Sequence, residues 1–300
     1  MAEAQRKIGA RAAGASALTA KVVTIIEARP KSVPAQLRAL WRYRHLYWPL
    51  MLDLSVKKYR GMMLGIWWVV IRPIVPMTIA VFTFTVVTSV ETDGIPYIIF
   101  YLSGAMTWTL FQSTMNFGAR TLMWTSGIVQ KTYFPKLMIP LASLGVPVLE
   151  FLVVFVLFIV ALVAVYFKTG FFYLRIDAAI LLLPVMFFMA TLMSLAIGMV
   201  LDVIALLLRD VLYTLTYVIQ LFMFLTPVFY PMSAIPEGYR WLVYLINPLA
   251  AIMETTRWSI TGHGEMDVLF LLYSCVSIMV MFAVSVLLFF RAEDYLGELI

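Results

Sequence analysis

The sequence predicts an all-α polytopic membrane protein with six transmembrane helices, an N-terminal cytoplasmic interfacial helix, and re-entrant helices between the fifth and sixth spans. Hydrophobic residues make up 63% of the 300 residues and charged residues 13%, whereas ordinary soluble domains contain ~45–50% and ~25%. Six segments also approach or exceed the ~20 apolar residues that a membrane span needs. A soluble fold of this length has no interior large enough for so much apolar surface.

The few cysteines and histidines exclude several kinds of site. A single cysteine, Cys275, permits no internal disulfide and no thiolate metal cluster. His45 and His263 lie far apart in the sequence, and we expect no metal site. The net charge of +6 does not indicate a nucleic-acid partner, because 13 of the 22 Lys and Arg residues lie between Arg6 and Arg72, mostly before the first span. Aromatic and basic residues do not alternate beyond that segment.

The N-terminal part divides into two segments. Residues 1–34 contain no apolar core ahead of a cleavage site, so we expect a cytoplasmic tail and not a signal peptide. In residues 35–60, apolar side chains such as Trp41 and Trp48 recur near helical spacing, with basic side chains opposite, as in a helix lying on the anionic inner leaflet. Pro49 is expected to break or kink this helix after Trp48. A soluble amphipathic helix packed on a partner has the same pattern.

Residues 61–300 are expected to form one six-span domain. The spans are predicted at about 62–88, 97–118, 141–167, 178–201, 212–230 and 268–290. The second span is the least hydrophobic, because Ser, Thr, Gln and Asn residues are spread along it. When alternate loops are assigned to the inner side, 18 of the 22 basic residues lie there. The positive-inside rule then places both termini in the cytoplasm.

Two connections between spans are unusual. Residues 123–140, on the inner side, are basic and mixed in polarity, which fits a short helix that projects toward a cytoplasmic partner. Residues 231–262, on the outer side, are apolar but interrupted by prolines, and we expect helical pieces at about 236–246 and 248–260. Irregular backbone at membrane depth is tolerated only inside protein or along a cavity. These pieces are therefore predicted to be re-entrant or interfacial.

No motif indicates catalysis by this chain. It has no Gly-x-x-x-x-Gly-Lys-Ser/Thr phosphate loop and no His-Glu-x-x-His, and we expect no cofactor on this chain. Charges within membrane spans are functional candidates. Arg72 and Glu150 lie at similar depths in the first and third spans, where they can pair; alternatively, Arg72 extends to the inner interface. Asp202, Arg209 and Asp210 are interpreted as a solvated turn.

Aromatic and hydrogen-bonding side chains form stripes on the second and fifth spans. A sugar ring stacks through its C–H face while its hydroxyls form hydrogen bonds, so these stripes are interpreted as walls of a substrate channel. Aromatic stripes also pack helices together or lie at membrane interfaces, and this alternative stays open. The stripe residues are Tyr97, Phe100, Tyr101, Trp108, Phe111, Gln112, Tyr213, Thr216, Tyr217, Gln220 and Phe224.

Three stretches together resemble one known family. They are Tyr59-Arg60-Gly61-Met62-Met63-Leu64-Gly65-Ile66-Trp67 before Pro73, Lys131-Thr132-Tyr133-Phe134-Pro135-Lys136 before Pro140, and Thr226-Pro227-Val228-Phe229-Tyr230-Pro231 with Asn247-Pro248 and Arg257-Trp258. On these motifs, about residues 35–295 resemble the ABC-2 type permeases that export polysaccharides such as O-antigen and teichoic acid.

The resemblance implies a function and roles for particular residues. It implies the transmembrane subunit of an exporter in the bacterial cytoplasmic membrane, where two copies of the chain form a channel for a lipid-linked polysaccharide. Two separate cytoplasmic ATP-binding cassette subunits would bind ATP and Mg²⁺, so this chain would not be an enzyme. ATPase coupling is expected at Trp41, Arg42, Lys58, Lys131, Tyr133, Phe134, Pro135 and Lys136. The extracellular gate is expected at Pro231, Pro236, Trp241, Asn247, Pro248 and Arg257.

Two other functions stay open. A related permease could export a drug or a small lipid, and a membrane-embedded enzyme or a carrier without ATP is the third candidate. The sequence names neither the sugar nor its lipid carrier.

Overall fold

The computed structural model describes most of the chain. The described residues are 33–60, 62–88, 91–129, 134–264 and 266–299, and they contain helices and no β-strand. They belong to a compact unit, Ser32–Ile300, while the unit Met1–Lys31 lies outside the description. The predicted tail therefore falls outside the described residues, apart from Val33 and Pro34, which begin the first described helix.

Helices account for nearly all of this unit. In chain order they are α2 (Val33–Arg42), α3 (Tyr47–Tyr59), α4 (Trp68–Phe82), α5 (Tyr97–Gly118), α6 (Thr121–Val129), α7 (Met138–Ala142), α8 (Gly145–Thr169), α9 (Leu183–Leu207), α10 (Val211–Leu225), α11 (Glu237–Ile246), α12 (Pro248–Thr261) and α13 (Val268–Leu299). Short 3₁₀ turns precede several of them, and a π-helical turn, Thr83–Val87, extends α4. The all-α class predicted from the sequence is confirmed.

Four helical stretches of the described residues are long and apolar enough to cross a membrane. They are Trp68–Val87, Met138–Thr169, Ala178–Leu207 and Val268–Ala292, and the apolar α10 is shorter. Each of the four overlaps a predicted span. The bounds of α5 coincide with the predicted second span, but α5 is too polar to qualify by composition. The count of six spans stays a prediction.

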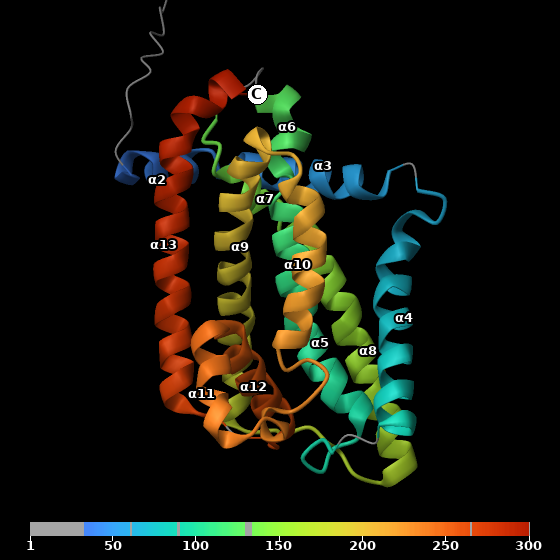
Figure 1. Cartoon of the computed structure of the whole chain (residues 1–300). Helices are drawn as coiled ribbons and strands as arrows, with labels where there is room; N and C mark the ends of the chain where they lie inside the picture. Colours follow the sequence, from blue (N-terminus) through green and yellow to red (C-terminus); the bar gives the residue numbers. More distant parts are fainter. Residues whose placement is uncertain (1–32, 61, 89–90, 130–133, 265, 300) are drawn as a thin grey trace, which may run out of the picture. The chain divides into compact units, whose positions relative to one another are not determined.

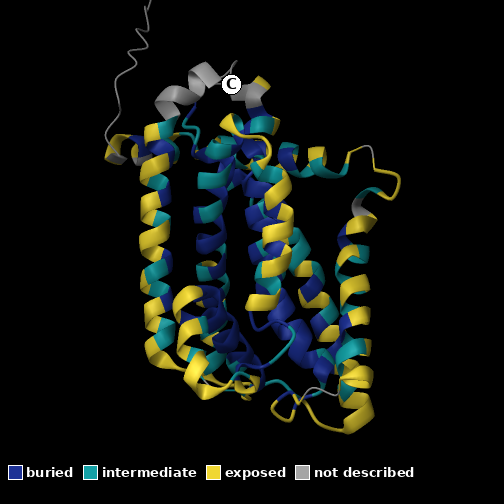
Figure 2. Ribbon diagram, in the orientation of Figure 1, coloured by how far each residue is buried: buried dark blue, intermediate teal, exposed yellow. Residues whose placement is uncertain are grey.

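The polar composition of α5 follows from its position inside the bundle. Of its 22 residues, 18 are buried, because α8 and α9 pack along it (Figures 1 and 2). Its hydroxyl groups are therefore surrounded by protein. Helices α5 and α9 approach closely at Gly118 and Gly198, where a Cβ atom added at Gly198 would lie in van der Waals contact, 3.5 Å from the Cα atom of Gly118.

Two predicted helix ends are wrong. Pro49 lies in the first turn of α3, where its missing N–H is not needed for an intrahelical bond, and the break comes earlier, at the 3₁₀ turn Arg44–Leu46. Helix α10 ends at Leu225, five residues before the predicted end of the fifth span. Thr226 is extended, with ψ 138°, because the following Pro227 disfavours the helical conformation.

The short helices gather at the two ends of the bundle. Helices α2, α3, α6 and α7 lie at one end, called here the α3 end, and α11 and α12 lie at the other, called the α12 end (Figure 1). The pieces predicted at 236–246 and 248–260 match α11 and α12 within one residue. Their re-entrant placement in a membrane stays a prediction.

Candidate functional site

At the α3 end, α3 packs closely against the start of α8. A Cβ atom added at Gly145 would lie 2.5 Å from Met51 Cγ and 2.9 Å from Ser55 Oγ. Leu50 and Leu54, on the same side of α3, are buried with Phe134 in an apolar cluster. The contact buries one face of α3 and leaves Trp48 64% exposed on another.

A charged cluster joins α3, α4 and α8. Glu150 Oε1 accepts hydrogen bonds from Lys58 Nζ at 2.7 Å and from the Tyr59 hydroxyl at 3.2 Å. Arg72 Nη1 lies 3.8 Å from the same oxygen. Burial lowers the pKa of Lys58, and the adjacent carboxylate opposes that shift. The sequence suggested Arg72 as the partner of Glu150, but the closer cation is Lys58, which was expected to face an ATPase.

The other residues expected to couple to an ATPase are spread over the α3 end. Trp41 is 71% exposed, with the Arg44 guanidinium 4.8 Å from its ring, and Arg42 is also exposed. Phe134 is buried, while Pro135 and Lys136 are half-buried. Lys131 and Tyr133 lie outside the described residues.

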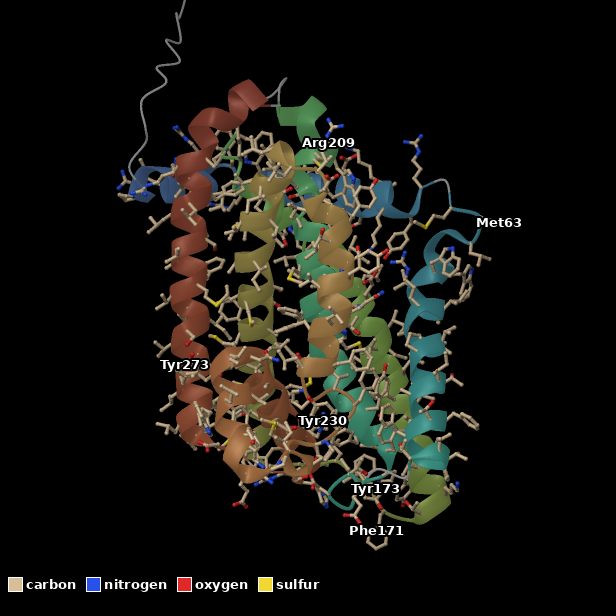
Figure 3. The ribbon with its side chains drawn as sticks, viewed as in Figure 1. Met63, Phe171, Tyr173, Arg209, Tyr230 and Tyr273 are labelled. Atoms are coloured by element: carbon tan, nitrogen blue, oxygen red, sulfur yellow. The ribbon has the colours of Figure 1, made fainter. Side chains whose placement is uncertain are left out.

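Helix α6, in the region of the predicted coupling segment, is anchored by a buried carboxylate. Asp202 of α9 is fully buried, and it accepts hydrogen bonds from Thr121 Oγ1 at 2.6 Å and from the Leu122 N–H at 3.1 Å. A carboxylate there satisfies N–H groups in the first turn and favours the positive end of the helix dipole. The interpretation of Asp202 as part of a solvated turn is wrong. Arg209, two residues beyond α9, is exposed at the α3 end (Figure 3).

The two aromatic stripes have opposite surroundings. Tyr97, Phe100, Tyr101, Trp108 and Phe111 are all at most 6% exposed. Trp108 donates to Gln112 at 2.8 Å, and its ring lies 6.3 Å from that of Phe222 on the inward face of α10. The α5 stripe is therefore part of the protein core.

On α10, the stripe points away from α5. Tyr213, Tyr217 and Phe224 are 76%, 68% and 65% exposed, and Thr216 and Gln220 are exposed beside them. The opposite face of α10 packs inward through residues such as Leu215 and Ile219. A single copy of the chain does not bring the two stripes together.

A cleft of about 170 Å³ opens between α4 and the helices α5 and α8. Tyr101, Trp108 and Gln112 of the α5 stripe reach its wall, and Arg72 and Glu150 also line it. It is the place where the predicted channel residues and the charged cluster meet.

At the α12 end, a buried arginine binds the irregular backbone that follows α10. Arg257 is 1% exposed, and its Nη2 donates to the Pro227 carbonyl at 2.8 Å. Its guanidinium lies 3.8 Å from the Phe100 ring, close against Gly104, and pairs with Glu254. Sequence reasoning missed Glu254; its spacing of three residues from Arg257 on one helix was the available signal.

The remaining predicted gate residues are divided between core and surface. Asn247 donates to Thr226 at 2.8 Å and accepts from the Leu249 N–H at 3.1 Å, so it caps α12 and fixes the end of α10. Pro248 occupies the first turn of α12 and is buried. Trp241 is 52% exposed. Pro231 and Pro236 flank the 3₁₀ turn that precedes α11.

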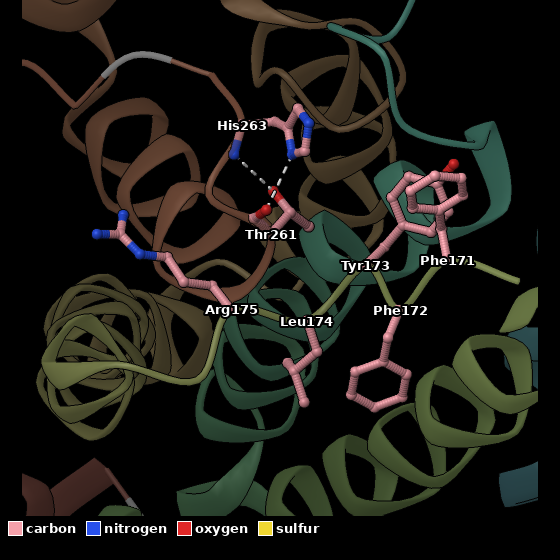
Figure 4. Close-up of a pocket in the computed structure, with 7 residues that line it drawn as sticks. All are labelled: Phe171, Phe172, Tyr173, Leu174, Arg175, Thr261 and His263. Carbon is pink, nitrogen blue, oxygen red and sulfur yellow. Dashed lines mark hydrogen bonds between the residues drawn. The ribbon is translucent and has the colours of Figure 1, made fainter.

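Beside α12 lies an open pocket of about 360 Å³, formed largely by the irregular connection after α8 (Figure 4). Phe171 and Phe172 are 72% and 50% exposed, and Arg175 stacks on Trp258 at 4.5 Å. His263 is held by the Thr261 carbonyl at 2.9 Å. Exposed aromatic residues directly after a span are typical of a membrane interface.

Long apolar helices around a buried polar helix, with amphipathic helices at one end, define a multi-pass membrane protein. The sequence profile of the ABC-2 type transporter family matches residues 48–261, and the chain belongs to that family.

Two relatives are similar over part of the chain. The O-antigen export system permease protein RfbA of Klebsiella pneumoniae is 32% identical over 100 residues, covering 33% of this chain and 38% of the relative. The protein of the same name from Myxococcus xanthus is 29% identical over 103 residues, covering 34% and 39%. The matched stretches thus span well under half of each relative.

Proposed function

We propose that this chain is the transmembrane subunit of an ATP-driven exporter that moves a lipid-linked polysaccharide across the bacterial cytoplasmic membrane. Two copies enclose the channel, and two cytoplasmic ATP-binding cassette subunits bind ATP and Mg²⁺. Family membership and the names of two O-antigen export permeases support the proposal. Within this proposal, the residues that face the glycan are chosen by their exposure in the structure.

The observation that carries the proposal is the exposed face of α10. A polar side chain without a hydrogen-bond partner is costly among acyl chains, so the exposed amide of Gln220 is poorly suited to lipid. Thr216 beside it bonds the Leu212 carbonyl of its own helix. The same face carries Tyr213, Tyr217 and Phe224, whose rings stack on sugars. A second copy opposite this face completes a polar, aromatic wall, and the α5 stripe supports that wall from behind.

The proposed arrangement has six spans, with both termini and the α3 end in the cytoplasm. The exposed Trp41 and Arg42 and the basic segment 123–140 then face the membrane surface and the ATPase. The excess of basic residues beside the first span supports this orientation. Helices α11 and α12 form the outer gate.

Export of surface glycan tests the α10 face. The triple variant Tyr213→Ala, Tyr217→Ala, Phe224→Ala is expected to lower export at least tenfold while the chain still assembles with its ATPase. A matched control replaces three exposed apolar residues of α13, Leu269, Leu272 and Val276, which are 73%, 59% and 63% exposed. Equal export by both triple variants would reject the channel wall, and export of a small lipid in place of glycan would favour the alternative substrate class.

A further inference from the structure

One carboxylate faces two cations where three helices meet. Glu150 of α8 is paired with Lys58 of α3 at 2.7 Å, and Arg72 of α4 lies 3.8 Å from the same Oε1 atom. The side chains of Lys58 and Glu150 are 14% and 13% exposed, whereas that of Arg72 is 51% exposed. Among the described residues, Arg72 has no other ion pair and no hydrogen bond through its side chain. One pair is formed, and a second cation lies beside it.

The chain between the two cations is not a single rigid rod. Helix α3 ends at Tyr59, and Arg60 leaves it in an extended conformation with ψ 129°. Gly65 then adopts φ +49°, a conformation that favours glycine, before α4 begins. Lys58 and Arg72 therefore approach Glu150 from two separate helices.

We propose that Glu150 exchanges its ion-pair partner Lys58 for Arg72 when α3 moves, so that a displacement of α3 is transmitted to α4. This inference rests on the proposed function, in which the ATPase subunits drive α3. Lys58, Arg72 and Glu150 act here as positioning residues, because they hold helices in place and do not act on ATP.

The energetics of a partly buried carboxylate favour such an exchange. If α3 withdrew Lys58 alone, Glu150 would lose its closest cation at a partly buried position, which is unfavourable unless Arg72 moves closer. Arg72 needs to approach by only about 1 Å to reach the 2.7–2.9 Å distance of a charge-assisted hydrogen bond. Its exposed side chain breaks no other hydrogen bond when it moves. Its planar guanidinium can also bind both carboxylate oxygens.

Mutant cycles on the purified full-length chain test the exchange without any assay of transport. Lys58→Met is expected to lower the unfolding temperature by about 5 °C, and Arg72→Met by about 1 °C, because Arg72 is only a secondary partner. In the Lys58→Met background, Arg72 is expected to be the ion-pair partner of Glu150. Adding Arg72→Met should then lower the unfolding temperature by several degrees more than Arg72→Met does alone. Lys57→Met is the matched control, since Lys57 forms an exposed pair with Asp53.

The cycle has a clear contrary result. If Arg72→Met costs the same with and without Lys58, Glu150 does not change partners and the exchange is overturned. Glu150→Gln provides a second check, because it should remove the extra cost of Arg72→Met in the Lys58→Met background.

A reversible lock tests the movement in the assembled transporter. In a chain carrying Cys275→Ser, the pair Met51→Cys and Gly145→Cys places two Cβ atoms within about 4 Å, a suitable distance for a disulfide. Oxidation should reduce export at least tenfold, and reduction should restore it to within twofold of each single-cysteine control. Unchanged export in the locked protein would overturn the proposal. Absence of ATP-driven export in the wild-type protein would instead reject the proposed function, and the mutant cycles would still decide the exchange.

Discussion

Helices α5 and α10 carry the same sequence pattern in opposite surroundings. Both have aromatic and hydrogen-bonding side chains on one face, yet the stripe on α5 is buried while Tyr213 and Tyr217 on α10 are 76% and 68% exposed. The difference arises because α8 and α9 pack along α5, whereas α10 packs on the bundle through its other face. An aromatic stripe therefore identifies one distinct face of a helix. The helices packed around that face decide whether it is buried in the core or exposed and available to a ligand.

The largest expected effect tests whether the α5 stripe is core. Trp108→Ala should lower the free energy of unfolding by about 4 kcal/mol, because it removes a large side chain that is 2% exposed. Reversible unfolding in mixed micelles measures this loss. Tyr213→Ala on α10 is the control, and an equal loss for both would contradict the comparison.

A slightly smaller effect is expected where the α12 end supports α5. Arg257→Met should cost about 3 kcal/mol, because it leaves Glu254 as an unpaired buried charge and removes the cation from the Phe100 ring. The same unfolding measurement applies. Glu254→Gln in the Arg257→Met background should recover part of the loss, and failure of this rescue would show that the ion pair is not the cause.

Asp202→Asn sharpens the comparison at the other end of α5, where α6 begins. We expect a cost of about 1–2 kcal/mol, since the amide keeps one acceptor oxygen but loses the second oxygen available to Thr121 Oγ1 and the Leu122 N–H. Hydrogen exchange of the first turn of α6 should accelerate locally. Replacement of the exposed Asp210 by Asn is the control. Faster hydrogen exchange of the first turn of α6 in this control variant as well would indicate a nonspecific effect.

The smallest effect on stability is expected on α10. Tyr217→Ala should change the free energy of unfolding by no more than about 0.5 kcal/mol, because the side chain is exposed. Under the proposed function it should still lower glycan export several-fold. A loss of stability comparable to that of Trp108→Ala would place Tyr217 in an interior and break the comparison.

Local signals predicted most of the secondary structure. The bounds of α5, α11 and α12 follow from Gly-Ile-Pro96, Pro236 and Asn247-Pro248, which act through backbone geometry and need no information about neighbours. The helix break predicted at Pro49 was wrong because proline also suits the first turn of a helix.

Interactions between distant residues could not be predicted in the same way. Hydropathy showed that Glu150 needs a partner, but Lys58 and Glu150 are separated by 92 positions, and only the packing of α3 on α8 brings them together. The distinction between the α5 and α10 stripes has the same origin, because periodicity identifies a face without identifying what covers it. The interpretation of Asp202 was wrong because its position near a turn in the sequence does not reveal that the first turn of α6 packs against it.

The break at Thr226–Pro227 leaves α10 with 15 residues, about 22 Å of helix, against a hydrocarbon core of about 30 Å. In the proposed six-span arrangement, irregular backbone therefore begins before the membrane ends, where no water is present to bind its carbonyl groups. Arg257 supplies a fixed donor to Pro227 and so replaces the missing solvent. Under the proposed function, the wall of the channel would then end below the membrane surface, and a polymer leaving α10 would pass next between parts of the protein and not into lipid.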